Sequence, residues 1–306
     1  MTHDHSDSSP HLHALGNYGR AFAVGIALNT AFVAGEAFYG VSSNSLALLS
    51  DAGHNLSDVM GLLLAWGAIR LSRSRPTRRH TYGLRRSSIL AALVNAATLL
   101  FVTGAISVEA IRRLFHPAPV IGSTIMWVAA VGVLVNGTTA AMFASGRKSD
   151  INVRGAFAHM AADALIALGV VVTGFMIRQT GWLWLDPATS IAIGIIIALA
   201  TWGLLKESVN LAMDAVPENI DPDAVETFLL SLPGVTNVHD LHIWAMSTTE
   251  PCLTAHLTVP GPAWDDSVLA STRATLHERF GIEHSTFQLE RGDFAHPCEQ
   301  SPELAV

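Results

Sequence analysis

Hydrophobic residues are gathered into six long stretches in the first two thirds of the chain, separated by short polar segments. The stretches run over residues 21–41, 45–71, 87–111, 120–145, 152–177 and 182–205. A helix needs about 20 predominantly apolar residues to cross the hydrocarbon core of a bilayer. The pattern therefore predicts a membrane α-helical bundle of six transmembrane helices.

The character of the chain changes at Asp214, where Pro217, Asp221 and Pro222 open a shorter and more polar region. The apolar positions in this region predict a helix over 222–231, strands over 235–246 and 252–259, a helix over 266–280 and a strand over 285–290. We therefore expect a His-containing tail (1–19), a six-span membrane domain (20–213), a small α+β domain of order αββαβ (214–292) and a C-terminal tail (293–306).

Composition supports a membrane protein. Half of the residues are hydrophobic, the mean hydropathy is +0.38, and 14% of the residues are charged, against about 25% in soluble domains. The polar N-terminal residues lack the features of a cleavable signal peptide. Cys252 and Cys298 both fall in the part expected to be cytoplasmic, so no disulfide framework is expected.

Charge is distributed unevenly and orients the spans. Residues up to Met213 hold 15 Lys and Arg against 10 Asp and Glu, and the remainder holds 3 against 15. Basic residues concentrate in the segments 70–86 and 147–154, on one side of the predicted bundle. The positive-inside rule then makes both loops and both termini cytoplasmic. Arg112 and Arg113 fall on the other side and oppose this orientation. We expect a multi-pass protein of the cell membrane, plasma or inner.

A motif of histidine and aspartate four residues apart occurs in two of the spans, as His54 with Asp58 and as His159 with Asp163. Residues four apart share one face of a helix. Ionisable groups are costly in hydrocarbon unless they are paired, hydrated or bound to an ion, so the two motifs indicate a shared polar site. Two imidazoles and two carboxylates can complete a four-coordinate zinc shell.

Other acidic residues lie near these motifs in the sequence. Asp51 belongs to the same helical stripe as His54 and Asp58, and is a candidate accessory ligand. Glu36 in the first span either lines an access path or is solvated near the outer interface. Asp58 and Asp163 both fall about midway along their spans, so antiparallel neighbours would bring them level.

Four segments together resemble the cation diffusion facilitators. They are SLALLSDAGHNLSD (45–58), HTYGLRR (80–86), NVRGAFAHMAAD (152–163) and GVTNVHDLHIW (234–244). The similarity covers residues from about 18 to 292, and the pairing of His with Asp resembles the zinc-exporting branch. The resemblance implies metal export from the cytoplasm, proton antiport, a homodimer and a metallochaperone-like cytoplasmic domain for regulation and dimerisation. The chain departs from the family pattern at Ser87 and Ser88, where members often carry an acid.

The resemblance also implies a cytoplasmic metal site. His239, His256 and Glu290 match positions that bind zinc in some relatives, and His284 is slightly displaced from its usual place. His242 is expected to be structural, because residues three apart on a strand face opposite sides unless a bulge intervenes.

Weaker candidates complete the set of site residues. His80 is the sole obvious ligand for a loop-borne site, and Cys298 lies in a terminal segment where a lone cysteine usually has no role. Asp214, just after the last span, could form a charge interlock with the Arg-rich loop that holds the dimer's domains together. The alternative is a solvated charge cluster that serves only topology.

These patterns together favour proton-coupled zinc efflux by alternating access. Cobalt, nickel or cadmium are the alternative substrates, since imidazole and carboxylate accept several divalent metals, and a non-transporting membrane metal sensor is a third hypothesis. An intramembrane protease is excluded because no H-E-x-x-H motif occurs, so no enzyme is expected. The expected partners are the metal ion, protons, the lipid bilayer and a second copy of the chain, with no nucleic acid. No cofactor is expected beyond transported zinc, with regulatory zinc left open.

Overall fold

The structure is a computed structural model that describes residues 29–72, 74–144, 151–261 and 264–292. The predicted N-terminal tail and the C-terminal tail with Cys298 lie outside the described residues. The chain forms two compact units. The first takes in the described residues of 29–62 and 97–201, and the second takes in the described residues of 63–96 and 202–292.

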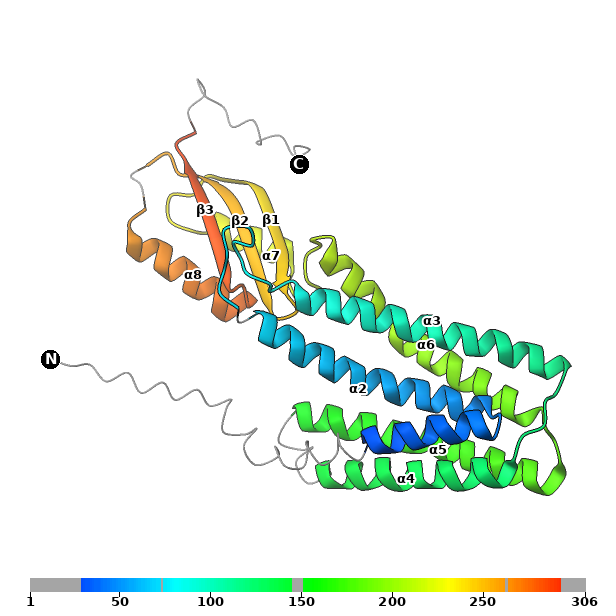
Figure 1. Cartoon of the computed structure of the whole chain (residues 1–306). Coiled ribbons are helices and arrows are strands. Elements are labelled where there is room, and N and C mark those ends of the chain that lie inside the picture. The colour runs from blue at the N-terminus through cyan, green and yellow to red at the C-terminus, as the bar shows by residue number, and fades with distance from the viewer. Residues whose placement is uncertain (1–28, 73, 145–150, 262–263, 293–306) are drawn as a thin grey trace. The chain divides into compact units, whose positions relative to one another are not determined.

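Helical segments lie at all six positions where the hydrophobic pattern predicts spans. Residues 29–42 are helical and precede five longer helices: α2 (Leu46–Ser72), α3 (Ser87–Phe115), α4 (Gly122–Phe143), α5 (Ile151–Thr180) and α6 (Leu185–Ala212) (Figure 1). Within the described part of the chain, α3, α4, residues 157–180 of α5 and α6 are long and apolar enough to cross a membrane. The helix α2 carries the polar stripe that contains Asp51, His54 and Asp58.

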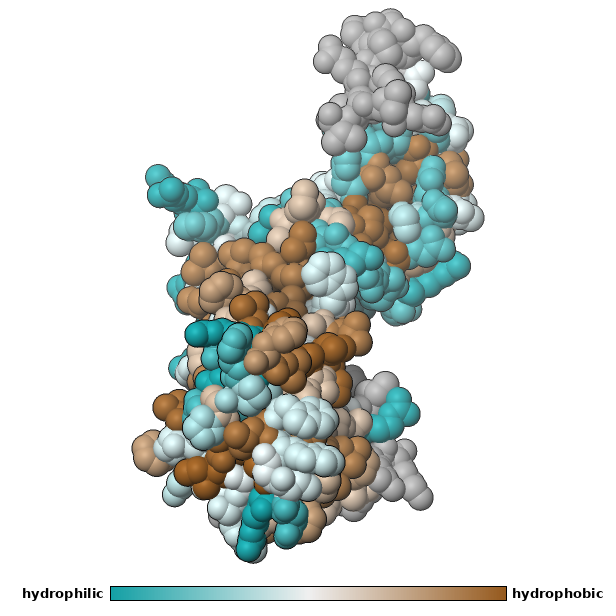
Figure 2. Space-filling view, turned by 90° about the vertical axis from the view of Figure 1, so that its right-hand side faces the viewer, coloured by the Kyte–Doolittle hydropathy of each residue, from teal (hydrophilic) through white to brown (hydrophobic). Residues whose placement is uncertain are grey.

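Large apolar side chains cover the outside of these helices, as the brown surface in Figure 2 illustrates. Several of them are more than 60% exposed, including Phe101, Val108, Trp127, Leu165 and Leu199. An apolar surface of this extent is unfavourable in water. The helices therefore form a transmembrane region whose outer faces are suited to lipid.

Two glycines allow α4 and α5 to approach closely. A Cβ atom added at Gly122 would lie 2.8 Å from the carbonyl oxygen of Gly174, and one added at Gly174 would lie 2.5 Å from the backbone nitrogen of Met126. Small residues allow this kind of backbone contact between membrane helices. The packing fixes the position of α5, which carries His159 and Asp163.

A buried carboxylate of α6 holds the start of α2. Asp186 is 0% exposed, and its oxygens accept hydrogen bonds from the Ser45 hydroxyl at 2.5 Å, from the Leu46 amide at 2.8 Å and from the Ala47 amide at 3.3 Å. A negative charge at a helix N-terminus is favourable, because the first amides of a helix have no partner within it.

We expect Asp186→Ala to destabilise the membrane region more than Ser190→Ala. The first change leaves buried donors of α2 unpaired, at about 1–3 kcal/mol for each such group. The second removes one hydroxyl contact between the same two helices, from Ser190 Oγ to Ser50 Oγ at 2.7 Å, which is worth about 1 kcal/mol. Thermal unfolding in detergent would measure both. Equal midpoints for the two variants would contradict the prediction.

The predicted αββαβ order of the small C-terminal α+β domain is confirmed. It consists of α7 (Pro222–Leu230), β1 (Asn237–Ser247), β2 (Glu250–Thr258), α8 (Asp266–Phe280) and β3 (His284–Glu290). Aspartates cap both helices: Asp221 accepts from the amides of Asp223 and Ala224, and Asp265 accepts from the amides that follow it. The hydrogen bond from the Ser267 hydroxyl holds the pKa of Asp265 below its ordinary value. This cap therefore weakens as the pH falls through that lowered pKa.

The three strands form one sheet in the order β1-β2-β3, with β1 antiparallel and β3 parallel to β2. The hydrophobic core of this domain includes Val225 and Leu229 of α7, Leu276 of α8, and Leu253 and Leu257 of β2. Side chains alternate between the two faces of a strand. His256 therefore lies on the opposite face of β2 from the core residues Ala255 and Leu257.

Candidate metal centres

The two motifs of histidine and aspartate meet between α2 and α5. Asp58 is the thirteenth residue of α2, and Asp163 is the thirteenth residue of α5. His54 Nε2 lies 3.8 Å from Asp58 Oδ2 and 3.4 Å from Asp163 Oδ1. His159 Nε2 lies 3.2 Å from Asp58 Oδ2 and 3.7 Å from Asp163 Oδ2. Each imidazole thus contacts both carboxylates.

Three of the four residues fit the ligand shell of one tetrahedral ion, and His159 lies outside this group of three. With metal-to-ligand bonds of about 2.0–2.1 Å, the ligand atoms of a tetrahedral zinc site are about 3.3–3.4 Å apart. His54, Asp58 and Asp163 offer ligand atoms that all lie within 4.8 Å of one another. The side chain of Asp163 is 1% exposed and that of His159 is 43% exposed, so His159 is the most accessible of the four.

Glu36 and Asp51 lie beside this group and are fully buried, each 0% exposed. The Asn55 side-chain amide donates to Glu36 Oε2 at 3.3 Å, and the Glu36 and Asp51 carboxyls lie within hydrogen-bonding reach of each other. Of the two interpretations of Glu36, a solvated residue at the outer interface is wrong for this structure, because its side chain is enclosed by protein.

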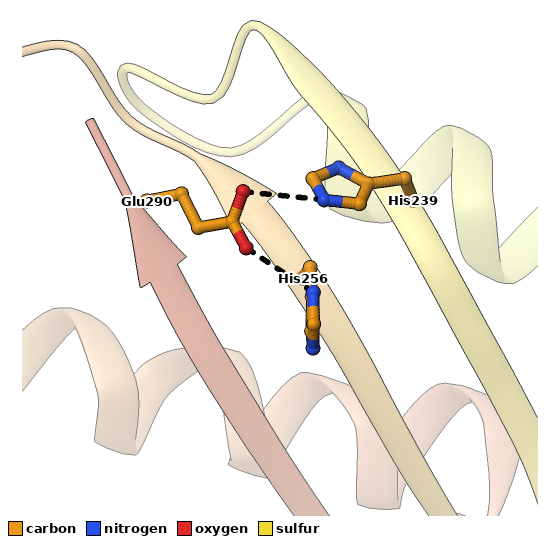
Figure 3. A group of neighbouring side chains, drawn as sticks. All are labelled: His239, His256 and Glu290. Carbon is orange, nitrogen blue, oxygen red and sulfur yellow. Dashed lines mark ion pairs between the residues drawn. The ribbon is translucent and has the colours of Figure 1, made fainter. Parts of the chain in front are cut away.

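A second group of candidate ligands lies on the sheet of the α+β domain (Figure 3). His239 Nε2 is 3.2 Å from Glu290 Oε2, and His256 Nδ1 is 3.2 Å from Glu290 Oε1. The three residues come from β1, β2 and β3, where His239 pairs with His256 and His256 pairs with Gln288. Their ligand atoms lie within 4.8 Å of one another, so the geometry allows a metal ion here, and binding stays a prediction.

A bulge in β1 changes the expected position of His242. The register shifts between His239 and His242, Asp240 has a φ of 50°, and His242 pairs with Thr254. One extra residue in the strand turns His242 onto the face that holds His256. The expectation that His242 faces the opposite side is therefore wrong, for the reason that a regular strand was assumed.

Asp240 is the residue of this group that sequence reasoning missed. Its Oδ1 lies 2.9 Å from His242 Nε2, and its Oδ2 lies 3.4 Å from His256 Nε2. Asp240 thus connects His242 to the group of His239, His256 and Glu290. Its place directly after His239 in the sequence was the only available signal, and the bulge that turns it inward is not visible in the pattern.

Two other candidates, His284 and His80, are placed elsewhere, and Cys252 is not suited to bind a metal. His284 pairs with Cys252, four residues before His256, which separates it from that histidine by about 13 Å along the strands. His80 lines a cavity of about 1070 Å³ formed with the loop before α3 and with β1, and is in neither ligand group of the described residues. Burial raises the pKa of the Cys252 thiol, which disfavours the thiolate that metals bind.

Asp214 contacts the Arg-rich segment within a single chain. Asp214 Oδ1 accepts from Arg86 Nη2, and both side chains are about half exposed. Next to this pair, Arg85 Nη1 lies 3.1 Å from Glu250 Oε1, and the Ser88 hydroxyl accepts from the Thr248 amide at 3.1 Å. The start of α3 is thus joined to the residues after α6 and to the turn between β1 and β2.

Comparison with models of known families assigns the transmembrane region and the C-terminal domain to the same protein family. Residues 22–211, more than half of the chain, match the model of the cation efflux transmembrane domain. Residues 217–292 match the model of the cation efflux protein, cytoplasmic domain. The chain belongs to the cation efflux family. Members of the cation efflux family are transporters, so the protein is a membrane transporter and not an enzyme.

Curated members of the cation efflux family are similar over nearly their whole length. The chain is 39% identical to the cation efflux system protein CzcD of Alcaligenes sp. (strain CT14) over 295 residues, or 95% of this chain and 91% of the relative. It is 37% identical to the zinc transporter ZitB of Escherichia coli (strain K12) over 292 residues, or 95% and 93%. It is 33% identical to the cadmium, cobalt and zinc/H(+)-K(+) antiporter of Bacillus subtilis (strain 168) over 285 residues, or 92% and 91%.

Proposed function

We propose that this cation efflux protein exports zinc from the cytoplasm by alternating access. In this proposal His54, Asp58, His159 and Asp163 bind the ion in transit. The observation that carries the proposal is that each imidazole lies within 3.8 Å of both carboxylates. Two carboxylates balance the charge of one divalent ion, and two imidazoles complete a tetrahedral shell of the kind that zinc prefers. No other ligand from the protein is needed.

The donor set favours zinc without excluding related metals. Imidazole suits several divalent transition metals, and affinity order alone does not select zinc among them. The relative from Escherichia coli is named a zinc transporter, and the one from Bacillus subtilis is named for cadmium, cobalt and zinc. Cobalt, nickel and cadmium are therefore the alternative substrates. A sensor that binds metal without moving it is disfavoured, because these relatives are named as transporters.

The charge pattern supports a topology with both termini in the cytoplasm of the cell. In this arrangement residues 20–213 form the transport domain and residues 214–292 form the regulatory domain. We further propose that the cytoplasmic domains pair two copies into a homodimer. His239, His256 and Glu290, with Asp240 nearby, would then bind regulatory zinc in the cytoplasm.

Proton exchange follows from the chemistry of the ligands. Zinc binds neutral imidazole and ionised carboxylate, so metal loading expels protons from the site and protonation helps to release the metal. A gradient of protons toward the cytoplasm would then drive zinc in the opposite direction. The name of the Bacillus subtilis relative includes both H(+) and K(+) as exchanged ions.

Inside-out proteoliposomes provide the test. Zinc added outside should accumulate in the lumen, an acidic lumen should accelerate this uptake, and uptake should make the lumen more alkaline. Parallel assays with cadmium, cobalt, nickel and manganese would define the substrate range. Zinc binding to the purified protein without any uptake would identify a sensor, and uptake that ignores an imposed pH gradient would exclude proton exchange.

The contact between Arg86 and Asp214 leads to a separate prediction. Asp214→Arg places two cations together, and we expect zinc uptake to fall by up to about fivefold, since an exposed ion pair is worth at most about 1 kcal/mol. Combining it with Arg86→Asp should restore uptake by recreating an ion pair of reversed polarity. Glu218→Arg, a charge reversal at another exposed acid nearby, is the matched control.

The charge interlock between Arg86 and Asp214 would be wrong if Asp214→Arg and Glu218→Arg changed zinc uptake equally. It would also be wrong if the double variant lost as much uptake as Asp214→Arg alone. Cross-linking of the purified protein would show in addition whether the charge reversal changes the dimer.

A further inference from the structure

A second polar group, which consists of Glu36, Asp51 and Asn55, lies next to the four proposed metal ligands and includes none of them. Asp51 and Asn55 are four residues apart on α2, so they share one face of the helix. Glu36 comes from the helix of residues 29–42. All three side chains are 0% exposed. The pair Asp51 and Asn55 lies three residues before His54 and Asp58 respectively, which is about 4.5 Å along the helix axis.

Hydrogen bonds do not satisfy this group. The Asn55 amide donates to Glu36 Oε2 at 3.3 Å. Glu36 Oε1, both carboxylate oxygens of Asp51 and the Asn55 carbonyl oxygen are buried acceptors that receive no hydrogen from another described group. Buried polar atoms are nearly always paired, because an unpaired acceptor loses its hydration without replacement. The group therefore has four buried acceptors that lack a donor among the described residues.

The two carboxyls can pair with each other only through a proton. They lie within hydrogen-bonding reach, but two ionised carboxylates both accept, and at this distance their charges repel. One proton converts one of them into a donor, which is how adjacent carboxyls in other proteins share a site. The charged or titratable neighbours that act on Asp51 are Glu36, His54 on α2 and Asp163 on α5. None of these is a lysine or arginine that could neutralise the pair permanently.

We propose that Glu36 and Asp51 share one proton, and that this pair is a proton-binding site of the exchange cycle, separate from the four metal ligands. The inference rests on the proposed zinc and proton exchange. When a divalent ion binds at His54, Asp58, His159 and Asp163, its charge favours the ionised form of the nearby pair. The O–H bond of the shared proton then breaks, the proton passes to water, and the protonated carboxyl becomes ionised like its partner. When the metal leaves, the pair takes up a proton again.

Proton release on zinc binding tests this directly in detergent. Calorimetry in buffers of different ionisation enthalpy counts the protons released per zinc bound. The variants Glu36→Gln and Asp51→Asn should each still bind zinc at the membrane site, and should release about one proton fewer than the wild type. Glu207→Gln, a carboxyl-to-amide change at an exposed position of α6, should release the wild-type number. An unchanged count in both pair variants would overturn the proposal, as would loss of zinc binding in both.

A measurement on the unaltered protein does not depend on the folding of any variant. The infrared difference spectrum on zinc addition should show loss of the carbonyl band of a protonated carboxyl group. Absence of that band before zinc is added would overturn the proposal.

Transport assays separate this inference from the proposed function. In proteoliposomes, Glu36→Gln and Asp51→Asn should retain zinc uptake down a zinc gradient at equal pH. The number of protons exchanged per zinc ion should fall by about one in each variant. If the wild type takes up no zinc, the proposed function fails while the calorimetric count still decides on the pair. If zinc uptake by the pair variants no longer depends on K+ while the number of protons exchanged per zinc ion is unchanged, the site binds K+ and the proton assignment is wrong.

Discussion

Replacing Asp163 with alanine should abolish zinc uptake, with a loss of at least about 100-fold, while the protein still folds and inserts. Removal of this carboxylate leaves Asp58 alone to balance a divalent charge in a medium of low dielectric constant, where an unbalanced charge is costly. The two imidazoles would also lose a shared partner, since Asp163 lies 3.4 Å from His54 and 3.7 Å from His159. Asp58→Ala should have the same effect. Uptake into proteoliposomes measures the loss.

Glu109→Ala is the control for this prediction. Glu109 is a partly exposed carboxylate of α3 that pairs with Arg112 and Arg113, and it lies outside the proposed site, so its removal should leave zinc uptake near the wild-type rate. Gel filtration and thermal unfolding would show that each variant is folded. Substantial zinc uptake by a folded Asp58→Ala or Asp163→Ala variant would exclude these residues as essential ligands.

Changing His54 to aspartate should move selectivity away from zinc. The substitution gives a shell of three carboxylates and one imidazole, and oxygen ligands suit manganese better than nitrogen ligands do. Zinc uptake should fall relative to manganese or cadmium, by about tenfold if one ligand changes relative binding by about 1.4 kcal/mol. Competition among these metals for uptake measures the ratio.

His116→Asp provides the matched control for the selectivity test, because His116 is an exposed residue just after α3. Its substitution should leave the ratios of zinc, cadmium and manganese unchanged. If His54→Asp also leaves these ratios unchanged, the ligand contributed by α2 does not determine selectivity.

The sequence was sufficient to predict the helices and the small α+β domain, because both rest on local periodicity. Long apolar runs identify the spans, and alternating apolar positions identify the strands. The geometry at Asp58 and Asp163 was also accessible, since spacing along each helix fixes the face and the depth of a residue. The helices, the strands and the position of each ligand on its own helix depend on residues close together in the chain, and the shared site was inferred from the cost of ionisable groups in hydrocarbon.

Features that depend on pairing between distant segments could not be predicted in the same way. The bulge at Asp240 arises from the register of β1 against β2, which adds one residue that no periodicity reveals. The partner of Asp214 could have been any of several arginines, and the structure selects Arg86. The burial of Asp186 under the first residues of α2 joins positions 140 residues apart. Tertiary packing decides each of these contacts.

The close mutual approach of the four membrane ligands limits the stoichiometry of the proposed site. Two metal ions about 3.5–4 Å apart need bridging groups and further ligands on each ion, and two imidazoles with two carboxylates cannot complete two such shells. The membrane domain of each chain would therefore carry a single ion per cycle. Uptake should then follow a hyperbolic dependence on zinc concentration for each protomer, and any sigmoidal response would have to originate in the cytoplasmic domain or in communication between protomers.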